Sequence, residues 1–208
     1  MKQTIGKSER LLRQLTALKN NSINMRLAAE KWDKKWKTLI AIMMSAQSRD
    51  ETTIIIAKKL FETYPSLESL ARADYKAVLS VFKSLNYNKT KTKHIIECAR
   101  ILVEEYAGKV PEDFEKLIQL PGVGRKTANV FLSEYGHDAI GVDTHVFYIS
   151  RKLGWAKSKT PKGVETELKE VFPKKDWINI NATLVRFGKT YPSKKKKDSI
   201  LNEIKKIN

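Results

Sequence analysis

Apolar residues recur at a helical period along most of the chain. Ile95, Ala99 and Leu102 lie four and three residues apart, and Phe114 and Leu117 repeat the shorter spacing behind a proline. Such spacing places apolar side chains on one face of an α-helix. The same pattern predicts helices at residues 8–19, 35–46, 51–64, 74–83, 89–106, 111–119, 125–135, 143–153, 161–172 and 177–189, with a final piece near residue 199. The predicted fold class is therefore all-α.

One segment argues against a helix. Residues 52–56 read Thr-Thr-Ile-Ile-Ile, a β-branched run that in isolation favours a strand. Asp50 before it is a good N-cap and residues 57–61 continue the helical pattern, so we predict a helix here too. No hairpin-turn signal and no long loop rich in Pro, Gly or Ser appears, so a domain boundary would fall where the chain crosses a cleft.

The charge of the chain narrows the class of partner. Its 208 residues include 40 Lys and Arg against 23 Asp and Glu, a net charge of +17, which favours nucleic acid or an anionic membrane surface. No apolar run approaches the roughly 20 residues of a membrane-spanning helix, and no apolar stretch of signal-peptide length follows the first seven residues. We therefore expect a cytoplasmic, nucleoid-associated protein that binds nucleic acid and no membrane.

The chain offers few metal ligands. Its single cysteine, Cys98, can form neither an internal disulfide nor a cysteine metal cluster, and its place in a helical apolar pattern predicts a core position. His94, His137 and His145 have no second ligand at metal-binding spacing, so no transition-metal site is predicted.

A glycine-punctuated turn lies between two predicted helices at residues 120–130, Leu-Pro-Gly-Val-Gly-Arg-Lys-Thr-Ala-Asn-Val. Gly122 and Gly124 allow positive φ and close backbone approach, and the helix that opens near Arg125 would direct its first amides and its positive dipole end outward. Main-chain donors would hold a phosphate without reading base sequence. An ordinary helix-turn-helix corner is the alternative, but the full string favours DNA binding.

Lys126 and Asp143 are the candidate chemical groups. Lys126 would lie in the first turn of the second hairpin helix, where the dipole and partial burial disfavour the ammonium form, and a free amine can form a Schiff base. An ordinary solvated lysine is an equal alternative in so basic a chain. Asp143 precedes a helical stretch, where an aspartate most often serves as an N-cap. Capping is compatible with catalysis, because a cap that faces a cleft also points its carboxylate outward.

Three segments in this order resemble the endonuclease III branch of the helix-hairpin-helix DNA glycosylases. They are residues 44–50 (Met-Ser-Ala-Gln-Ser-Arg-Asp), the string at 120–130 and residues 142–145 (Val-Asp-Thr-His), and the resemblance runs from about residue 36 to 188. It implies a two-lobed helical fold with the active site in the cleft between lobes. One lobe would be a six-helix barrel at residues 28–137, and the other would join residues 1–27 to 138–208.

The resemblance also implies roles for individual residues. Lys126 matches the family's catalytic lysine, which attacks C1′ of the damaged nucleotide, and Asp143 matches the aspartate that stabilises positive charge at the sugar. Gln47 matches a glutamine that enters the stack where the base was flipped out, although a surface position at a helix end is the alternative. In the loop of residues 85–89 the family's glycine is replaced by Asn86, and Tyr87 takes the wedge position.

The complete set of implied DNA-binding residues is Gln47, Tyr87, Asn88, Lys89, Gly122, Val123, Gly124, Arg125 and Thr127. The resemblance also allows a monovalent cation at the main-chain carbonyls of Ile118, Leu120 and Val123.

The C-terminus departs from the family. Most members place four cysteines there to hold an iron–sulfur cluster, whereas residues 188–197 contain none and end in four lysines, so we expect no such cluster. Two interpretations remain for the end of the chain. The lysines could contact phosphate while Ile200, Leu201, Ile204 and Ile207 supply terminal packing, or residues after 192 could form a disordered, solvated tail.

These observations predict a monomeric, bifunctional DNA glycosylase with AP-lyase activity, which excises oxidised pyrimidines from duplex DNA and cleaves the abasic strand by β-elimination. A glycosylase for thymine or uracil opposite guanine is an alternative, because no motif fixes the base pocket. A non-catalytic helix-hairpin-helix module that only binds DNA is an alternative of another class.

Overall fold

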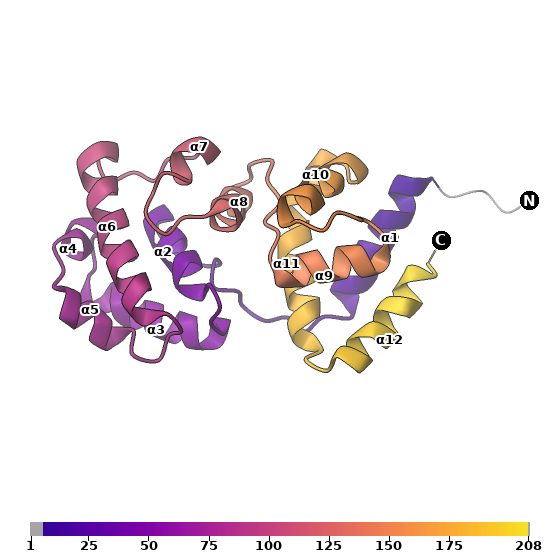
Figure 1. Cartoon of the computed structure of the whole chain (residues 1–208), viewed down its shortest axis with the longest axis horizontal. Helices are drawn as coiled ribbons and strands as arrows, with labels where there is room; N and C mark the ends of the chain where they lie inside the picture. Colours follow the sequence, from indigo (N-terminus) through magenta and orange to yellow (C-terminus); the bar gives the residue numbers. More distant parts are fainter. Residues whose placement is uncertain (1–5, 208) are drawn as a thin grey trace, which may run out of the picture. The chain divides into compact units, whose positions relative to one another are not determined.

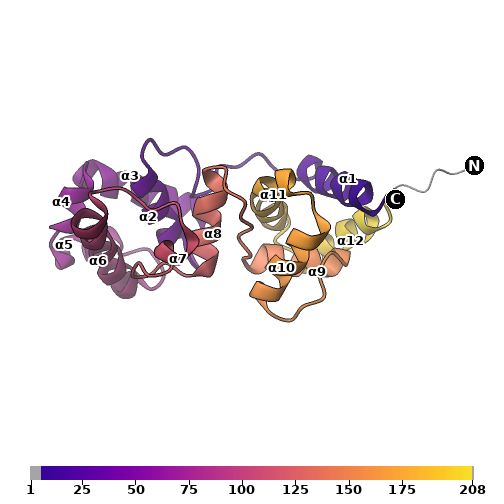
Figure 2. The ribbon, with the colours of Figure 1, turned by 90° about the horizontal axis from the view of Figure 1, so that it is seen from above.

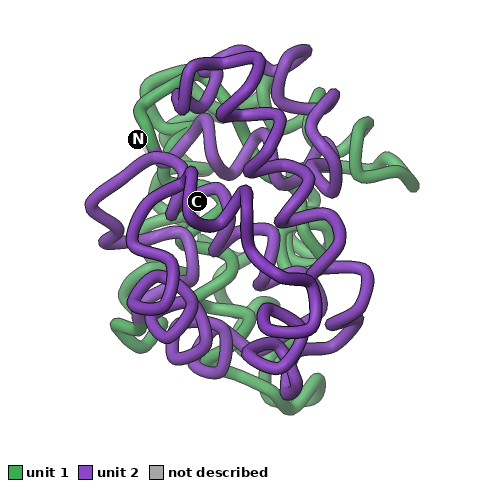
Figure 3. The backbone as a smooth tube through the Cα atoms, turned by 90° about the vertical axis from the view of Figure 1, so that its left-hand side faces the viewer, with its two compact units in different colours: residues 1–25, 135–208 green, residues 26–134 purple. Residues whose placement is uncertain are grey.

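The computed structural model describes residues 6–207; residues 1–5 and 208, on which the prediction about a signal segment partly falls, lie outside the described residues. Within the described range the chain is helical and contains no strand, which confirms the all-α class. No helix in that range combines the length and apolar character needed to cross a membrane. The chain divides into two compact units, residues 1–25 with 135–208 (unit 1) and residues 26–134 (unit 2), which Figure 3 colours separately.

Unit 2 is built around one buried helix. Residues 39–44 of α2 are 0–4% exposed, and α2 contacts α3, α6 and α8, as Figures 1 and 2 show. A helix that is apolar on all sides belongs at the centre of a helical unit. The helices of unit 2 are α2 (Lys35–Ser45), α3 (Asp50–Thr63), α4 (Leu67–Ala71), α5 (Tyr75–Val81), α6 (Asn88–Tyr106), α7 (Phe114–Leu117) and α8 (Arg125–Glu134).

Two helix starts in unit 2 differ from the prediction. The β-branched run forms part of α3 as predicted, but α3 begins at Asp50 itself, with Arg49 as the N-cap residue. The Asp50 carboxylate thus lies in the first turn, where the helix dipole favours negative charge. Pro111 precedes α7 instead of opening it, because the side chain of Asp113 accepts the Lys116 amide and starts the helix there.

Unit 1 joins the first described helix to the last four. α11 contacts both α1 and α9, and α12 packs against the same two helices. In the core of unit 1 the indole of Trp155 donates to the side-chain oxygen of Gln14 at 2.7 Å, and Trp155 meets Phe172 edge to face at 4.8 Å. The elements of unit 1 are α1 (Lys7–Asn20), α9 (Thr144–Leu153), α10 (Pro161–Val171), the 3₁₀ turn η1 (Lys174–Asp176), α11 (Trp177–Thr190) and α12 (Lys194–Lys205).

Candidate active site and nucleic-acid interface

The glycine-containing turn joins α7 to α8. The Leu120 carbonyl accepts the Val123 amide at 3.0 Å and closes a tight turn. Within it Gly122 has a φ of +77°, and a Cβ at this position would lie 2.8 Å from Cβ of His94 on α6. Glycine is therefore required at position 122 for two reasons, the left-handed backbone and the close packing of His94.

Gly124 differs from Gly122. Its φ lies outside the left-handed region, so the predicted use of positive φ applies to Gly122 alone. Gly124 is exposed, and a Cβ there would meet no atom within 4 Å. No described contact in unit 2 requires a glycine at this position. The residue lies directly before α8, whose first amides have no carbonyl from an earlier turn of the same helix. The absence of a side chain at position 124 leaves open space at this end of the helix.

The other predicted hairpin residues fall into two groups. Val123 and Thr127 are 4% and 8% exposed, so their side chains belong to the core and they can reach a ligand through main-chain groups only. Arg125 is exposed, and its guanidinium carbon lies 4.8 Å from the centre of the Phe114 ring on α7. This cation–π contact orients Arg125 beside the turn.

The structure places the two candidate catalytic residues at the starts of two helices. Lys126 is the second residue of α8 in unit 2 and is half-buried. Asp143 is the N-cap of α9 in unit 1, also half-buried, and its Oδ1 accepts the Val146 amide at 2.8 Å. The N-cap role predicted for Asp143 is thus confirmed.

The segment that carries Asp143 is anchored to α11. The Asn181 side chain donates to the Gly141 carbonyl at 2.7 Å. Two residues after Asp143, the ring of His145 packs against Gly188 so closely that a Cβ there would lie 2.2 Å from its Nδ1. These contacts on both sides of Asp143 fix where its carboxylate lies within unit 1, and sequence reasoning identified neither Asn181 nor Gly188 as part of the site.

Gln47 and Tyr87 lie in two loops of unit 2 that are joined to each other. The Gln47 loop (residues 46–49) follows α2, and the Tyr87 loop (residues 82–87) leads into α6. The Asn86 side chain donates to the Gln47 carbonyl at 2.5 Å, so the two loops that carry these predicted DNA-binding residues are in contact. Asn88 and the exposed Lys89 begin α6 directly after Tyr87.

Both loop residues have an uncommon backbone conformation. Gln47 and Tyr87 have φ of 54° and 56°, a region that costs a residue with a Cβ about 1–2 kcal/mol. Both side chains are exposed, Tyr87 by 65%. Positive φ also occurs at Ala107, where it ends α6, and at Lys31. At Gln47 and Tyr87 the conformation directs a large polar and a large aromatic side chain outward from adjoining loops.

Lys91 is a residue of this region that sequence reasoning missed. It is 8% exposed, and its Nζ donates to the carbonyls of Met44 and Ala46, both at 2.7 Å, and to Ser48 Oγ at 3.0 Å. Burial lowers the pKa of Lys91 to about 8. Its sequence position carried a signal, because Lys91 precedes the core residue Ile95 by one helical turn and so shares its buried face.

The residues available for a cofactor are few. Cys98 is buried in α6, as predicted, and burial raises the pKa of its thiol to about 12. The described residues contain no group of three or more His, Cys, Asp or Glu that could hold a metal ion. An iron–sulfur cluster needs several thiolates, which one buried cysteine does not supply. The carbonyls of Ile118, Leu120 and Val123 stay a predicted site for a monovalent cation.

The end of the chain is an ordered helix. Leu201 and Ile204 of α12 are 0% and 3% exposed, so the interpretation as a solvated tail is wrong for the residues of α12. Asp198 accepts a hydrogen bond from Tyr148 of α9 and forms an ion pair with Lys152 at 3.6 Å. The packing predicted for the end of the chain is therefore confirmed for Leu201 and Ile204, whereas Ile200 and Ile207 are only half-buried. Residues 194–196 are three exposed lysines at the start of α12.

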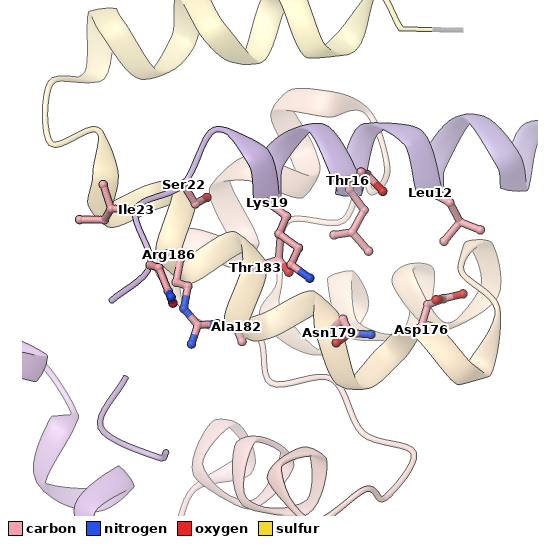
Figure 4. Close-up of a pocket in the computed structure, with 12 residues that line it drawn as sticks. Leu12, Thr16, Lys19, Ser22, Ile23, Asp176, Asn179, Ala182, Thr183 and Arg186 are labelled. Carbon is pink, nitrogen blue, oxygen red and sulfur yellow. The ribbon is translucent and has the colours of Figure 1, made fainter. Parts of the chain in front are cut away.

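A groove of about 610 Å³ in unit 1 contains none of the predicted site residues. Figure 4 shows Lys19 and Thr16 of α1 facing Asn179 and Thr183 of α11 across it. Asp176 lines one end, and its buried Oδ2 has no hydrogen-bond partner. Because Asp143 lies elsewhere in unit 1, the groove is separate from the candidate chemistry.

Comparison with known proteins gives consistent matches. A family model described as HhH-GPD superfamily base excision DNA repair protein matches residues 40–174. The endonuclease III of Thermotoga maritima is 43% identical over 155 residues, which cover 74% of this chain and 73% of that protein.

Two solved structures agree with the chain in fold. One is a trapped covalent intermediate of an endonuclease III with DNA, in an estranged-adenine complex, and it matches with a TM-score of 0.81 and 29% identity over 91% of this chain and 89% of that one. The other is a non-covalent endonuclease III–DNA complex, with a TM-score of 0.82 and 28% identity over 92% and 89% of the two chains.

Proposed function

The chain belongs to the HhH-GPD superfamily of base excision DNA repair proteins, and on that premise we propose that it is a bifunctional DNA glycosylase and AP lyase acting on oxidised pyrimidines in duplex DNA. The observation that carries the proposal is the hairpin of unit 2. There a turn that requires glycine at 122, and that has open space around a Cβ at 124, precedes a helix with Lys126 in its first turn. A site shaped only by folding would not need the second glycine.

We propose that the hairpin binds the phosphodiester backbone. Phosphate oxygens would approach over Gly124 to the first amides of α8, with the guanidinium of Arg125 beside them. Main-chain donors carry no base-sequence information, which suits an enzyme that finds damage in any sequence. The exposed lysines at 194–196 would add further phosphate contacts from unit 1.

The chemistry follows from an amine and a carboxylate. The neutral amine of Lys126 would attack C1′ as the bond from C1′ to the base breaks. The base would leave with the electron pair of that bond and take up a proton. Opening of the sugar ring then gives a Schiff base. Loss of a proton from C2′ breaks the C3′–O bond and cleaves the strand on the 3′ side, and water releases the lysine. Asp143 would stabilise the positive charge that develops at the sugar.

Borohydride trapping tests the proposal. Borohydride reduces a Schiff base to a stable amine, so the wild-type protein and a duplex with one abasic site should give a covalent adduct that Lys126→Ala lacks. Lys76→Ala, at an exposed lysine of α5, is the matched control and should give the wild-type adduct. Tight binding of the duplex by wild type without an adduct would instead support the non-catalytic module.

The substrate class needs its own measurement. Single-turnover excision from duplexes that each carry one lesion should be fastest for a ring-saturated pyrimidine such as thymine glycol. Faster excision of thymine or uracil opposite guanine would replace the substrate class and leave the Lys126 chemistry unchanged.

A further inference from the structure

We propose that Lys91 is a positioning residue for the insertion of side chains into the DNA duplex. It holds the Gln47 and Tyr87 loops so that both side chains enter the duplex together. The proposal rests on the proposed function, since it assumes that these loops meet damaged DNA. It adds a residue to which neither the family pattern nor the hairpin assigns a role. Lys91 would touch no nucleotide, so its effect would pass through the two loops.

The contacts of Lys91 reach both loops. Its Nζ binds the Ala46 carbonyl and the Ser48 hydroxyl, the two neighbours of Gln47 in sequence, at 2.7 and 3.0 Å. Its main-chain amide donates to the Tyr87 carbonyl at 3.0 Å. One residue of α6 thereby fixes the position of each loop, and the bond from Asn86 to the Gln47 carbonyl at 2.5 Å closes the connection between them.

The identity of the side chain matters for these contacts. The last carbonyls of a helix have no amide partner within it, and at the end of α2 the Lys91 ammonium supplies the donor to Met44 as well as to Ala46 beyond it. The three groups that accept hydrogen bonds from the Lys91 ammonium are two main-chain carbonyls and a hydroxyl. All three are uncharged, so none of them forms an ion pair with the buried cation. An ammonium group offers three donors from one point, which a neutral side chain of this length does not.

The left-handed backbone conformation at Gln47 supports a functional role for the contacts of Lys91. A strained backbone persists only where the surroundings determine it, and such residues cluster at functional sites. Here bonds from Lys91 flank Gln47 on both sides, and a bond from Asn86 meets its own carbonyl. If Lys91 only capped α2, its loss would lower stability without changing how the exposed side chains meet DNA.

The experiment separates insertion into DNA from chemistry. A duplex carries 2-aminopurine opposite a tetrahydrofuran abasic-site analogue, which no glycosylase or lyase step can consume, and a rise in fluorescence reports that the probe base is unstacked. We expect a rise with wild type and with Lys93→Met, an exposed lysine two residues along the same helix. Lys91→Met should lose most of the rise while binding undamaged duplex with unchanged affinity. Its borohydride trapping on a true abasic duplex should slow by about 10-fold or more.

Several outcomes would overturn the inference. One is a folded Lys91→Met with the wild-type rise and trapping rate, and another is a wild type that binds the analogue without any rise. If Lys91→Met does not fold, Asn86→Ala decides, because Asn86 is exposed and its loss should also reduce the rise; a full rise there would refute the connected loops. Failure of the proposed function has a different signature, which is fluorescence as expected but no trapped adduct with wild type.

Discussion

The two hairpin glycines predict opposite effects of the same substitution. Gly122→Ala places a Cβ on a backbone with φ of +77°, at a cost of about 1–2 kcal/mol, and 2.8 Å from Cβ of His94, where overpacking costs about 1–3 kcal/mol more. The sum of about 2–5 kcal/mol is a large part of the roughly 5–15 kcal/mol that stabilises a typical protein. Gly124→Ala meets no atom and should stabilise by about 0.4–1 kcal/mol, because alanine restricts the unfolded chain.

Urea unfolding followed by circular dichroism measures the stability of both variants, and fluorescence anisotropy with a labelled duplex measures their DNA affinity. Gly124→Ala should bind about tenfold more weakly despite its stability, because its methyl group obstructs a phosphate contact worth roughly 1.4 kcal/mol. In a His94→Gly background, which lacks the Cβ that a side chain at position 122 would meet, Gly122→Ala should lose only the backbone part of this cost. Equal stability of the two single variants, or wild-type DNA affinity in Gly124→Ala, would refute the reasoning.

Three further predictions concern charge. Asp143→Asn should keep the helix cap and the wild-type stability, while Asp143→Ala should lower the free energy of unfolding measured with urea by about 1 kcal/mol. Both variants should slow base excision about 100-fold. Wild-type activity of Asp143→Asn would show that the carboxylate has no part in the mechanism. Burial lowers the pKa of Lys91 from 10.5 to about 8, so between these pH values the unfolded chain binds more protons than the folded one. The free energy of unfolding of the wild type should therefore rise with pH across this window, by up to about 3 kcal/mol relative to Lys91→Met. A difference in stability between the two proteins that does not change with pH would contradict the buried charge. Replacing lysines 194–196 by glutamine should weaken DNA binding and flatten the plot of log affinity against log salt by about 1 for each phosphate that these lysines neutralise, whereas an unchanged slope would exclude α12 from the interface.

Local pattern predicts much of unit 2. The residues after the β-branched run keep a helical period, which is why the sequence predicts a helix there, and α3 confirms it. The turn at Gly122 can be predicted because a glycine between two helical patterns favours a tight turn. The five-residue α4 escapes prediction, since a segment of little more than one turn has no measurable period.

Long-range contacts are the part that sequence does not reveal. Lys91 is one lysine in a chain with 40 basic residues, and only the fold shows that its ammonium group faces the end of α2. The order of α12 likewise depends on Tyr148, fifty residues earlier, which binds Asp198. Such contacts depend on which helices pack against each other. The spacing of apolar residues along one helix predicts its buried face but not the helix that covers it.

The discontinuity of unit 1 has a consequence for synthesis. Residues 26–134 are contiguous, so unit 2 can acquire its native contacts while the ribosome is still adding residues. α1 is made before unit 2 yet packs against α11 and α12, which follow unit 2 in the chain, so its partners do not exist until residues 26–134 have been made. The apolar stripe of α1, with Leu11 and Leu18 at 2% and 0% exposure in the finished fold, therefore stays uncovered until α11 and α12 have been made.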